Sequence, residues 1–533
     1  MKLLNLSIAL LLSIVFITSC TKKDESLKHL PKTADMVFTF NPQQLQEKSE
    51  VKNIAETKAY KNFTKNITAE ESEHFQSFDY IFKDSDESGI DLAKNVFFFE
   101  NNQHNGYNTS VGVNFMLANS TKFTAMIEKI VESKSDSIEI VVEDGINYLI
   151  RKGKESKSIL AWNETTVVAI HQTKGRSNIK YLKENTALLI NQKTSNSLAS
   201  NKDFSEFYSK RKDINLWLGS DFLLSKIPQE YRTIVKMQSP IKLKDIGYHH
   251  YIDFQNGNAI MESELILPDD LKSLVEEFHV IKENFDEKML TIIPQKSLFN
   301  LSFAVDPYEF YRMIKKLYAE RQVDTKGMEQ LLEASTDIKL EKVLKAFAGE
   351  VIINVHDIKL LMVSNEDDTT ANPTSHTETK FLYSVAVKLD DEEVYNWAVK
   401  QFSDNEPEMV DGYYVLFDED GDNYIAMLDN YLLLTNDKNV IVNFTTKKKL
   451  KPSLADSDIG THLRKYPVYA RINMDYSNYS NDIQNFFDTT YNDDLQMKNK
   501  LSEIIYEPES SYRSEVSFSF KDKNTNSLKQ ILN

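Results

Sequence analysis

Met36–Pro42 reads MVFTFNP, and Leu298–Pro307 reads LFNLSFAVDP. In both stretches apolar side chains alternate with other residues, as they do in a strand that buries one face. Each stretch then ends on Asn or Asp followed by proline. An Asn or Asp side chain caps a helix, and proline at the first helical position loses no hydrogen bond, because that N–H has no partner inside the helix. Both stretches therefore predict a strand that leads directly into a helix, at places 263 to 265 residues apart.

The similarity continues in the same order along the chain. Strand-like segments match in pairs: Asn95–Glu100 with Glu350–Val355, Val111–Leu117 with Phe381–Val387, Ile214–Leu218 with Val468–Ile472, and Ser263–Ile266 with Ser514–Ser517. Asp144-Gly145 and Asp411-Gly412 each open a pair of hairpins. We therefore expect a tandem internal duplication, with repeat one over residues 30–290 and repeat two over residues 291–533. The alternative is one irregular chain in which strand–helix units resemble one another by chance.

These units indicate the fold class. Strands that lead into capped helices and then into hairpins favour an α+β fold, with antiparallel sheets and helices packed on one face, over a doubly wound sheet. The chain has 533 residues, more than a single hydrophobic core usually supports. We therefore expect two or more domains.

The N-terminus carries a targeting signal. An apolar run from Leu3 to Ile17 is too short to span a bilayer, which takes about 20 helical residues, and Thr18-Ser19-Cys20 follows it. This order is typical of a bacterial lipoprotein signal peptide over residues 1–19, cleaved between Ser19 and Cys20. Cys20 is the only cysteine of the chain. We expect it to carry acyl chains such as palmitate, with residues 20–29 as a tether to the lipid bilayer.

Composition excludes several classes of function. The chain has 80 acidic and 63 basic residues and a formal net charge of −17, which opposes binding to nucleic acid. Acylation of Cys20 would leave no thiol for disulfides, cysteine catalysis or thiolate metal sites. The cores must therefore hold the fold together.

The residues after Cys20 predict where the protein is delivered. Thr21 stands where an inner-membrane retention signal would have aspartate, so we expect delivery to the outer membrane. Lys22–Glu25 (KKDE) resembles the short export signals of lipoproteins displayed on the cell surface. The alternative is an ordinary solvated linker.

Several features together suggest a family. The signal sequence that ends at Cys20, the phrase Leu30–Asp35 (LPKTAD), the strand that ends in Asn-Pro and the total length resemble an uncharacterised family of Bacteroidota-type outer-membrane lipoproteins, a domain of unknown function. The resemblance implies a location and a fold. It carries over no catalytic residue, because the matching motifs are structural.

One acidic run is spaced like a calcium loop. Asp418, Asp420, Asp422 and Asp429 stand at positions one, three, five and twelve. However, Asn423 occupies the position at which such a loop needs glycine, and the run lies between two predicted strands. A hairpin turn therefore explains these residues better than a metal site.

The remaining candidates point away from catalysis. His249 and His250 are adjacent on a predicted strand, so their rings should face opposite sides and not share an ion. No serine-hydrolase or phosphate-binding signature occurs in the sequence. Tyrosines gather at Tyr413-Tyr414 and at Tyr476 and Tyr479. We interpret them as half-buried strand residues, although exposed rings could also stack on a sugar or anchor a partner.

The sequence thus predicts a non-enzymatic, lipid-anchored envelope protein without a cofactor, which binds or scaffolds at the outer membrane. An envelope protein or a glycan is the expected partner. The alternative is a surface hydrolase of envelope or environmental polymers, whose carboxylate pair is hidden among the 80 acidic residues.

Overall fold

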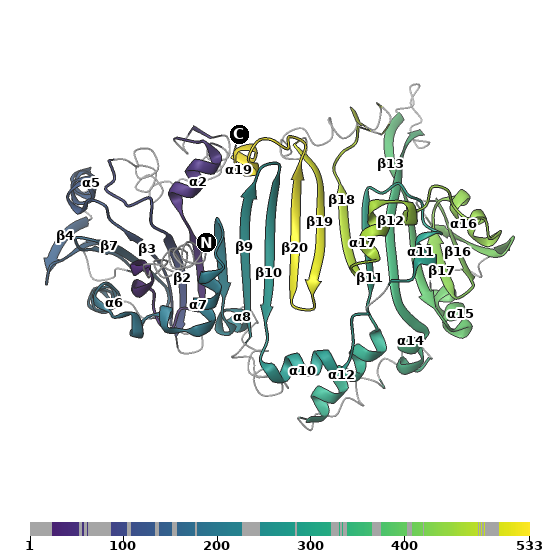
Figure 1. Cartoon of the computed structure of the whole chain (residues 1–533), viewed down its shortest axis with the longest axis horizontal. Coiled ribbons are helices and arrows are strands. Elements are labelled where there is room, and N and C mark those ends of the chain that lie inside the picture. The colour runs from purple at the N-terminus through teal and green to yellow at the C-terminus, as the bar shows by residue number, and fades with distance from the viewer. Residues whose placement is uncertain are drawn as a thin grey trace, which may run out of the picture. The chain divides into compact units, whose positions relative to one another are not determined.

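The computed structural model describes most of the chain after the predicted signal peptide. The described residues are 24–52, 56–57, 61, 87–103, 108–133, 138–151, 157–175, 178–225, 246–282, 285–320, 330, 333, 338–364, 375–401, 408–418, 421–477, 479, 481, 484–485 and 500–532. They divide into two compact units (Figure 1). Unit one comprises Met1–Gln43 and Asp84–Lys210, and unit two comprises Gln44–Lys83 and Arg211–Asn533.

Unit one is built on an antiparallel sheet in the order β1-β2-β3-β7-β6-β5-β4. Its strands are β1 (Met36–Phe40), β2 (Val96–Gln103), β3 (Asn108–Met116), β4 (Ile138–Glu143), β5 (Ile146–Arg151), β6 (Ser158–Trp162) and β7 (Thr166–Lys174). Its helical segments are η1 (Glu25–His29), α5 (Ser120–Ser133), α6 (Ile179–Asn191), η4 (Thr194–Asn196), η5 (Leu198–Ser200) and α7 (Lys202–Ser209).

Alternate residues of β1 are buried, but they are not those of the uniformly apolar face. Val37 and Thr39 are fully buried, whereas Met36, Phe38 and Phe40 remain partly exposed. Val37 lies opposite Phe99 of β2, which is also buried. One face of the sheet therefore forms the core of unit one.

Unit two contains a longer antiparallel sheet, in the order β8-β9-β10-β20-β19-β18-β11-β12-β13-β17-β16-β15-β14. Its strands are β8 (Ile214–Leu218), β9 (Gly247–Gln255), β10 (Asn258–Ile266), β11 (Phe299–Ala304), β12 (Phe347–Ser364), β13 (Ser375–Leu389), β14 (Glu408–Val410), β15 (Tyr413–Asp418), β16 (Gly421–Leu428), β17 (Tyr431–Thr435), β18 (Val468–Asn473), β19 (Leu501–Ser510) and β20 (Arg513–Phe520).

The helical segments of unit two lie between these strands and after them. They are α2 (Pro42–Ser49), α8 (Ser220–Ser225), α10 (Asp269–Glu277), α11 (Glu287–Leu290), α12 (Pro307–Glu320), α14 (Leu340–Ala346), α15 (Glu392–Gln401), α16 (Lys438–Thr445), η7 (Leu454–Asp456), α17 (Asp458–Leu463) and α19 (Ser527–Leu532). The first two residues of α2 fall in unit one by number. The described fold is mixed and antiparallel, which confirms the predicted α+β class.

Both predicted transitions from strand to helix are confirmed. β1 ends at Phe40 and α2 begins at Pro42, while β11 ends at Ala304 and α12 begins at Pro307. Asp306 caps α12, because its carboxylate accepts hydrogen bonds from the N–H groups of Tyr308 and Glu309, at 3.0 and 2.9 Å. The side chain of Asn41 donates to the carbonyl of Ala93, 3.0 Å away.

The two predicted hairpin turns are also confirmed. Asp144-Gly145 joins β4 to β5, and Asp411-Gly412 joins β14 to β15. The φ angles are +50° and +76° in the first turn and +47° and +87° in the second. Two-residue hairpins favour such left-handed turns, because their twist matches that of the strands, and glycine tolerates the conformation best.

Helices pack on both faces of the sheet in unit two, so the prediction of helices on one face is wrong there. Tyr424 and Ala426 of β16 contact a core that includes residues of α11, α16 and α17. Ile425, between them, contacts a core with α14 and α15. Successive side chains of a strand point to opposite faces. Because both faces of these strands carry apolar side chains, each face is buried only when helices pack against it.

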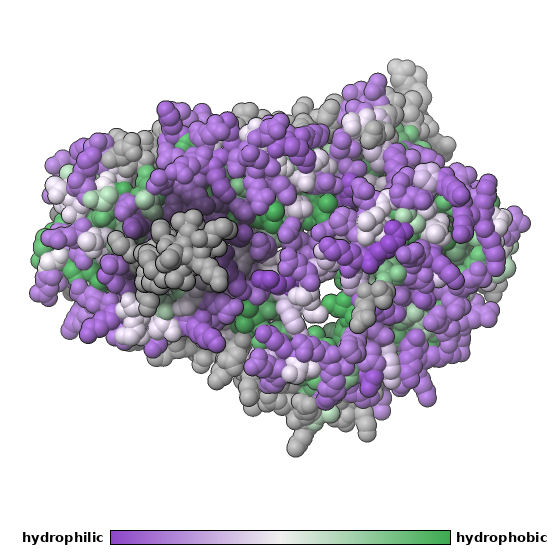
Figure 2. All heavy atoms as spheres, in the orientation of Figure 1, coloured by the Kyte–Doolittle hydropathy of each residue, from purple (hydrophilic) through white to green (hydrophobic). Residues whose placement is uncertain are grey.

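The visible face of the molecule is mainly hydrophilic. Hydrophilic residues occupy most of the face seen in Figure 2, and apolar residues show in smaller patches between them. None of the helices in the described ranges is both long and apolar enough to cross a membrane. The predicted signal peptide, including Ser19 and Cys20, lies outside the described residues.

Candidate functional site

Asp429 lies far from the hairpin turn at which the predicted acidic run begins. β15 ends at Asp418 and β16 begins at Gly421, with Asp422 opposite Phe417, so this segment is a hairpin; Asp420 lies outside the described residues. Asp429 follows the other end of β16, about 23 Å along the strand from Asp422 at roughly 3.3 Å per residue. Its carboxylate lies 3.2 Å from the ammonium of Lys447. The hairpin interpretation is therefore confirmed.

The two adjacent histidines face opposite sides of β9, as predicted. His249 is buried, and its ring lies 4.0 Å from the carboxylate of Glu264. His250 lies 2.9 Å from the hydroxyl of Ser263, and burial lowers the pKa of His250. Within the described ranges, no group of three His, Cys, Asp or Glu side chains is arranged to hold a metal ion.

The tyrosines singled out from the sequence belong mainly to cores. Tyr413 is 3% exposed and packs edge-on against Tyr424, and Tyr479 is 7% exposed beside Tyr476. Tyr413 lies on a strand as interpreted, whereas Tyr476 and Tyr479 follow β18 and lie outside the strands, and Tyr413 and Tyr479 are more deeply buried than expected.

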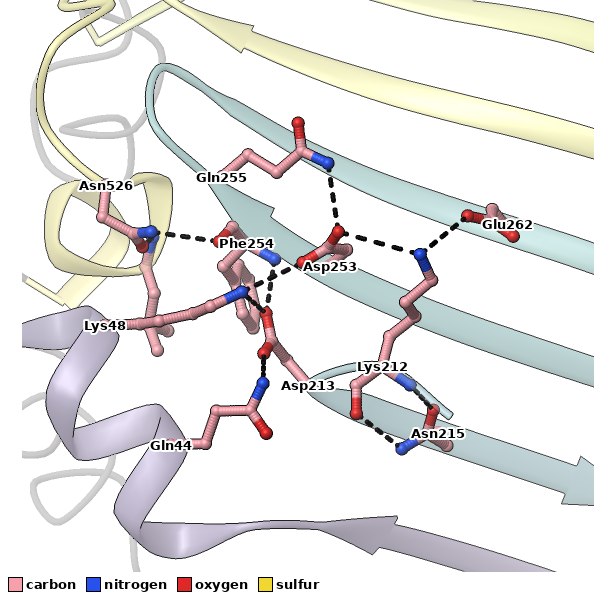
Figure 3. Close-up of polar contacts among 11 residues, drawn as sticks. Gln44, Lys48, Lys212, Asp213, Asn215, Asp253, Phe254, Gln255, Glu262 and Asn526 are labelled. Carbon is pink, nitrogen blue, oxygen red and sulfur yellow. Dashed lines mark hydrogen bonds and ion pairs between the residues drawn. The ribbon is translucent and has the colours of Figure 1, made fainter. Parts of the chain in front are cut away.

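A cluster of buried charge joins α2 to β9 and to Asp213, the residue before β8 (Figure 3). Lys48 of α2 lies 2.6 Å from a carboxylate oxygen of Asp213 and 3.0 Å from one of Asp253. The Asp213 side chain is completely buried, and it also accepts hydrogen bonds from the Gln44 side chain and the Phe254 N–H, at 2.7 and 2.6 Å. Three donors thus surround one buried carboxylate.

Electrostatics keeps Lys48 charged. Burial opposes the charge of its ammonium, but the hydrogen bonds to Asp213 and Asp253 outweigh this and raise the pKa of Lys48. Burial raises the pKa of Asp213, an effect that Lys48 and the Phe254 N–H partly counter. A lysine that acts as a nucleophile needs a lowered pKa. Lys48 is therefore suited to hold α2 against the sheet and not to form covalent intermediates.

The charged residues continue across the sheet from this cluster. Lys212 lies 4.0 Å from Asp253 and 3.7 Å from Glu262 of β10. Glu262 stands directly opposite Glu515 of β20, and Glu515 stands opposite Glu507 of β19. Opposed residues on neighbouring strands have Cβ atoms about 4.5–5.5 Å apart. Three carboxylates thus lie side by side on three strands, and we call them the glutamate row.

The middle member of the glutamate row differs from its neighbours. Glu262 lies near Lys212, and Glu507 lies 2.6 Å from His462, whereas no ion pair to Glu515 is found among the described residues. Burial, followed by the charges of Glu262, Glu507 and Glu509, raises the pKa of Glu515. General acid catalysis uses a carboxyl group whose pKa is raised by its surroundings beside a second, ionised carboxylate.

Sequence reasoning missed both clusters. Asp213 and Lys48 are 165 residues apart in the sequence. Glu262 and Glu515 are also far apart in the sequence, and they meet only because β10 pairs with β20. One local signal was available, because Glu262 and Glu264 alternate with Met261 and Ser263 and so mark a polar face of β10. That pattern gives the face but not the partners.

Comparison with known proteins places the chain in a family. No curated protein and no solved structure matches it. A family model does match over residues 28–528, nearly the whole chain after the predicted signal peptide. This confirms the expected resemblance to an uncharacterised family, while lipid anchoring and a bacterial source remain predictions. The chain therefore belongs to the family described as Domain of unknown function (DUF4836).

Proposed function

We propose that this protein is a non-enzymatic lipoprotein of the outer membrane, which binds or scaffolds other envelope components. The single observation that carries the proposal is the signal-like run that ends at Cys20, the only cysteine of the chain. Each buried methylene of an acyl chain contributes about 0.8 kcal/mol, and two or more chains anchor a protein stably. The folded body would then be attached to the membrane without spanning it.

The cluster around Lys48 gives no support to a catalytic role. Lys48, Asp213 and Asp253 satisfy one another, with further donors from Gln44 and Phe254. Such an arrangement positions backbone elements and offers no free nucleophile at that point. The KKDE segment at Lys22–Glu25 further supports display on the cell surface.

Metabolic labelling tests the anchor. In cells supplied with radioactive palmitate, the wild-type chain should incorporate label and fractionate with the outer membrane. Cys20→Ala should remain an unlabelled full-length precursor. Ser19→Ala is the matched control, since it keeps a small residue at the cleavage site and should still be labelled. Labelling of Cys20→Ala would refute the proposal.

We further propose that residues 30–290 and 291–533 are tandem copies of one unit. The order β1-β2-β3-β7-β6-β5-β4 has its counterpart in β11-β12-β13-β17-β16-β15-β14. The three strands that follow, β8-β9-β10, correspond to β18-β19-β20. A shared order of this complexity supports common ancestry over chance similarity.

Details of the connecting segments support the same proposal. The N–H of Leu198 donates to the carbonyl of Leu30, and the N–H of Leu454 donates to that of Ile293. Three residues later in each copy, Asn201 caps α7 by accepting from Phe204, and Ser457 caps α17 by accepting from Gly460.

The two copies would also contact each other through their last strands and last helices. β10 pairs with β20, so the last strands of the two repeats lie side by side, as Figure 1 shows. α10, which follows β10, packs its Leu274 and Phe278 against Met313 and Leu317 of α12. Conversely, α19, the last helix of repeat two, contributes Leu528 to a core against which Leu45 of α2 in repeat one packs. Each repeat would thus contribute its last helix to the other.

A hydrolase is the second candidate, because of the glutamate row. Glu515 and Glu262 are directly opposed, and the pKa of Glu515 is raised by burial and by its acidic neighbours. Glycosidases that retain configuration use two carboxyl groups about 5–5.5 Å apart, one of them with a raised pKa. If the protein is a hydrolase, Glu515→Gln should abolish release of reducing sugar from envelope polysaccharide, while Glu509→Gln should not. Absence of any such release by the wild type would exclude this candidate.

A further inference from the structure

A pocket of about 420 Å³ lies beside β18 in unit two. It is lined by the segment Pro294–Ser297, by Pro452, and by Arg471, Asn473, Asp475 and Tyr479. Its volume falls in the lower part of the range of small-molecule sites, roughly 300–1,000 Å³. Most such sites are lined mainly by apolar residues, whereas here every lining residue except the two prolines carries a polar or charged group. The pocket is therefore suited to a small polar ligand.

Three buried polar atoms of this lining lack hydrogen-bond partners among the described residues. They are the hydroxyls of Ser297 and Tyr479 and the Nε of Arg471. Tyr479 as a whole is only 7% exposed, so its hydroxyl is held inside the protein. An unpartnered buried polar group costs about 1–3 kcal/mol, and native proteins rarely leave three together without water or a ligand.

Fully buried polar residues of β11 and β12 lie next to the pocket wall. Asn354 of β12 is fully buried, and its amide donates to the carbonyls of Pro294 and Lys296, at 3.3 and 3.2 Å. Asn300 of β11, directly opposite Asn354, is fully buried as well. The amide of Asn354 thus fixes the segment that forms one wall of the pocket.

Charges around the pocket are already balanced. The ammonium of Lys296 lies 2.9 Å from Asp357 and 3.7 Å from the centre of the Tyr479 ring. Arg471 lies 2.8 Å from Glu503. Asp475 adds a carboxylate to the lining. Because both cations are neutralised, an anionic ligand would meet no excess positive charge, whereas hydroxyl groups could both donate and accept here.

We propose that this pocket binds a neutral saccharide unit, of one or two sugar rings. Sugar hydroxyls would accept from the Arg471 Nε–H and exchange hydrogen bonds with the hydroxyls of Ser297 and Tyr479, and they would donate to Asp475. The inference rests on the proposed binding role, to which it adds a ligand class. It does not depend on lipid anchoring.

Titration calorimetry with the full chain in detergent micelles tests the proposal. The probes are a panel of neutral sugars (glucose, galactose, mannose, N-acetylglucosamine and their disaccharides), with glucuronic acid and inorganic phosphate as anionic comparisons. At least one neutral sugar should bind. Tyr479→Phe and Ser297→Ala should each weaken that binding about three- to tenfold, because each removes one hydrogen bond.

Controls separate binding from folding and from anchoring. Tyr479→Phe and Ser297→Ala remove unpartnered groups, so the midpoint of thermal unfolding should not fall. Tyr506→Phe, on β19 outside the pocket lining, should leave sugar binding unchanged. If no neutral sugar binds, if the anionic probes bind in preference, or if Tyr479→Phe and Ser297→Ala bind as the wild type does, the saccharide assignment is wrong. Palmitate labelling of the wild type would be unaffected by any of these outcomes, so the anchoring proposal is judged separately.

Discussion

Val37 and Phe99 of unit one, and Asn300 and Asn354 of unit two, occupy matching places in the two proposed repeats. Each pair is directly opposed across the first two strands of its repeat, and all four residues are at most 1% exposed. The first pair packs as hydrocarbon, whereas the second is polar, and Asn354 fixes a wall of the pocket. Strand pairing therefore tolerates either chemistry at this place, and under the two proposals only the second copy would be open to a ligand.

The reverse difference occurs on the helices that follow these strands. Lys48 and Met313 both stand six residues after the helix-opening proline. Lys48 pairs with two carboxylates, while Met313 packs against Phe278 in an apolar cluster. One copy therefore fixes its helix with buried charge and the other with hydrophobic contacts. Substitutions at these matching sites can test how far each solution depends on its surroundings.

The largest effect is expected for Lys48→Met, which gives repeat one the residue of repeat two. The change leaves the buried Asp213 carboxylate without its cation, and removing one partner of a buried pair costs about 3–5 kcal/mol. Urea unfolding at pH 7 should show this loss, and Lys48→Met with Asp213→Asn should recover part of it. The exposed Lys52→Met is the control. A loss below about 1 kcal/mol for Lys48→Met would contradict the assigned role.

The pH dependence of that variant sharpens the test. Burial raises the pKa of Asp213, and removal of Lys48 would raise it further. A carboxyl group whose pKa is higher in the folded chain than in the unfolded chain binds more protons when folded at pH values between the two, so stability increases as the pH falls through the folded value toward the unfolded value. The deficit of Lys48→Met should therefore shrink as the pH falls from 7 toward 3.8, the ordinary value for an aspartate.

A smaller effect is expected from exchanging the residues at the opposed strand positions. Val37→Asn places an amide in an apolar core and should lower the free energy of unfolding by about 1–3 kcal/mol. Asn300→Leu should lower it by less, because it removes the Nδ2, which has no partner among the described residues, together with the Oδ1 that accepts from the buried Ser302 hydroxyl 3.0 Å away. Urea midpoints measure both variants. Equal losses in the two would show that the asparagines of repeat two are needed for packing itself.

The smallest effect is expected at the glutamate row. The raised pKa of Glu515 means that the folded chain binds its proton more tightly than the unfolded chain does, so this group opposes folding increasingly as the pH rises above 4.5. Glu515→Gln should stabilise the chain at pH 7 by about 0.2–1 kcal/mol, as expected when like charges opposite each other on strands are relieved. The gain should vanish near pH 4. A loss of stability at pH 7 would mean that the carboxylate has a favourable partner.

Local features of this protein were determined by the sequence alone. The passage from strand to helix at Pro42 and Pro307, the turns at Asp144-Gly145 and Asp411-Gly412, and the opposite orientation of His249 and His250 all follow from neighbours within a few residues. Alternation along a strand, helix capping and turn conformation act over that range. The α+β class followed from the order of these units.

The candidate sites were decided only by the tertiary structure. Lys48 meets Asp253 across 205 residues of chain, and Glu262 meets Glu515 because β10 pairs with β20 in one register. The same holds for the helices on both faces of β16, where the apolar run favours burial but does not name the helix that covers each face. Strand partners and register depend on the summed packing of segments far apart in sequence. For that reason the pattern around Asn300 predicted a strand, and only the folded chain set its amide opposite Asn354, beneath the pocket.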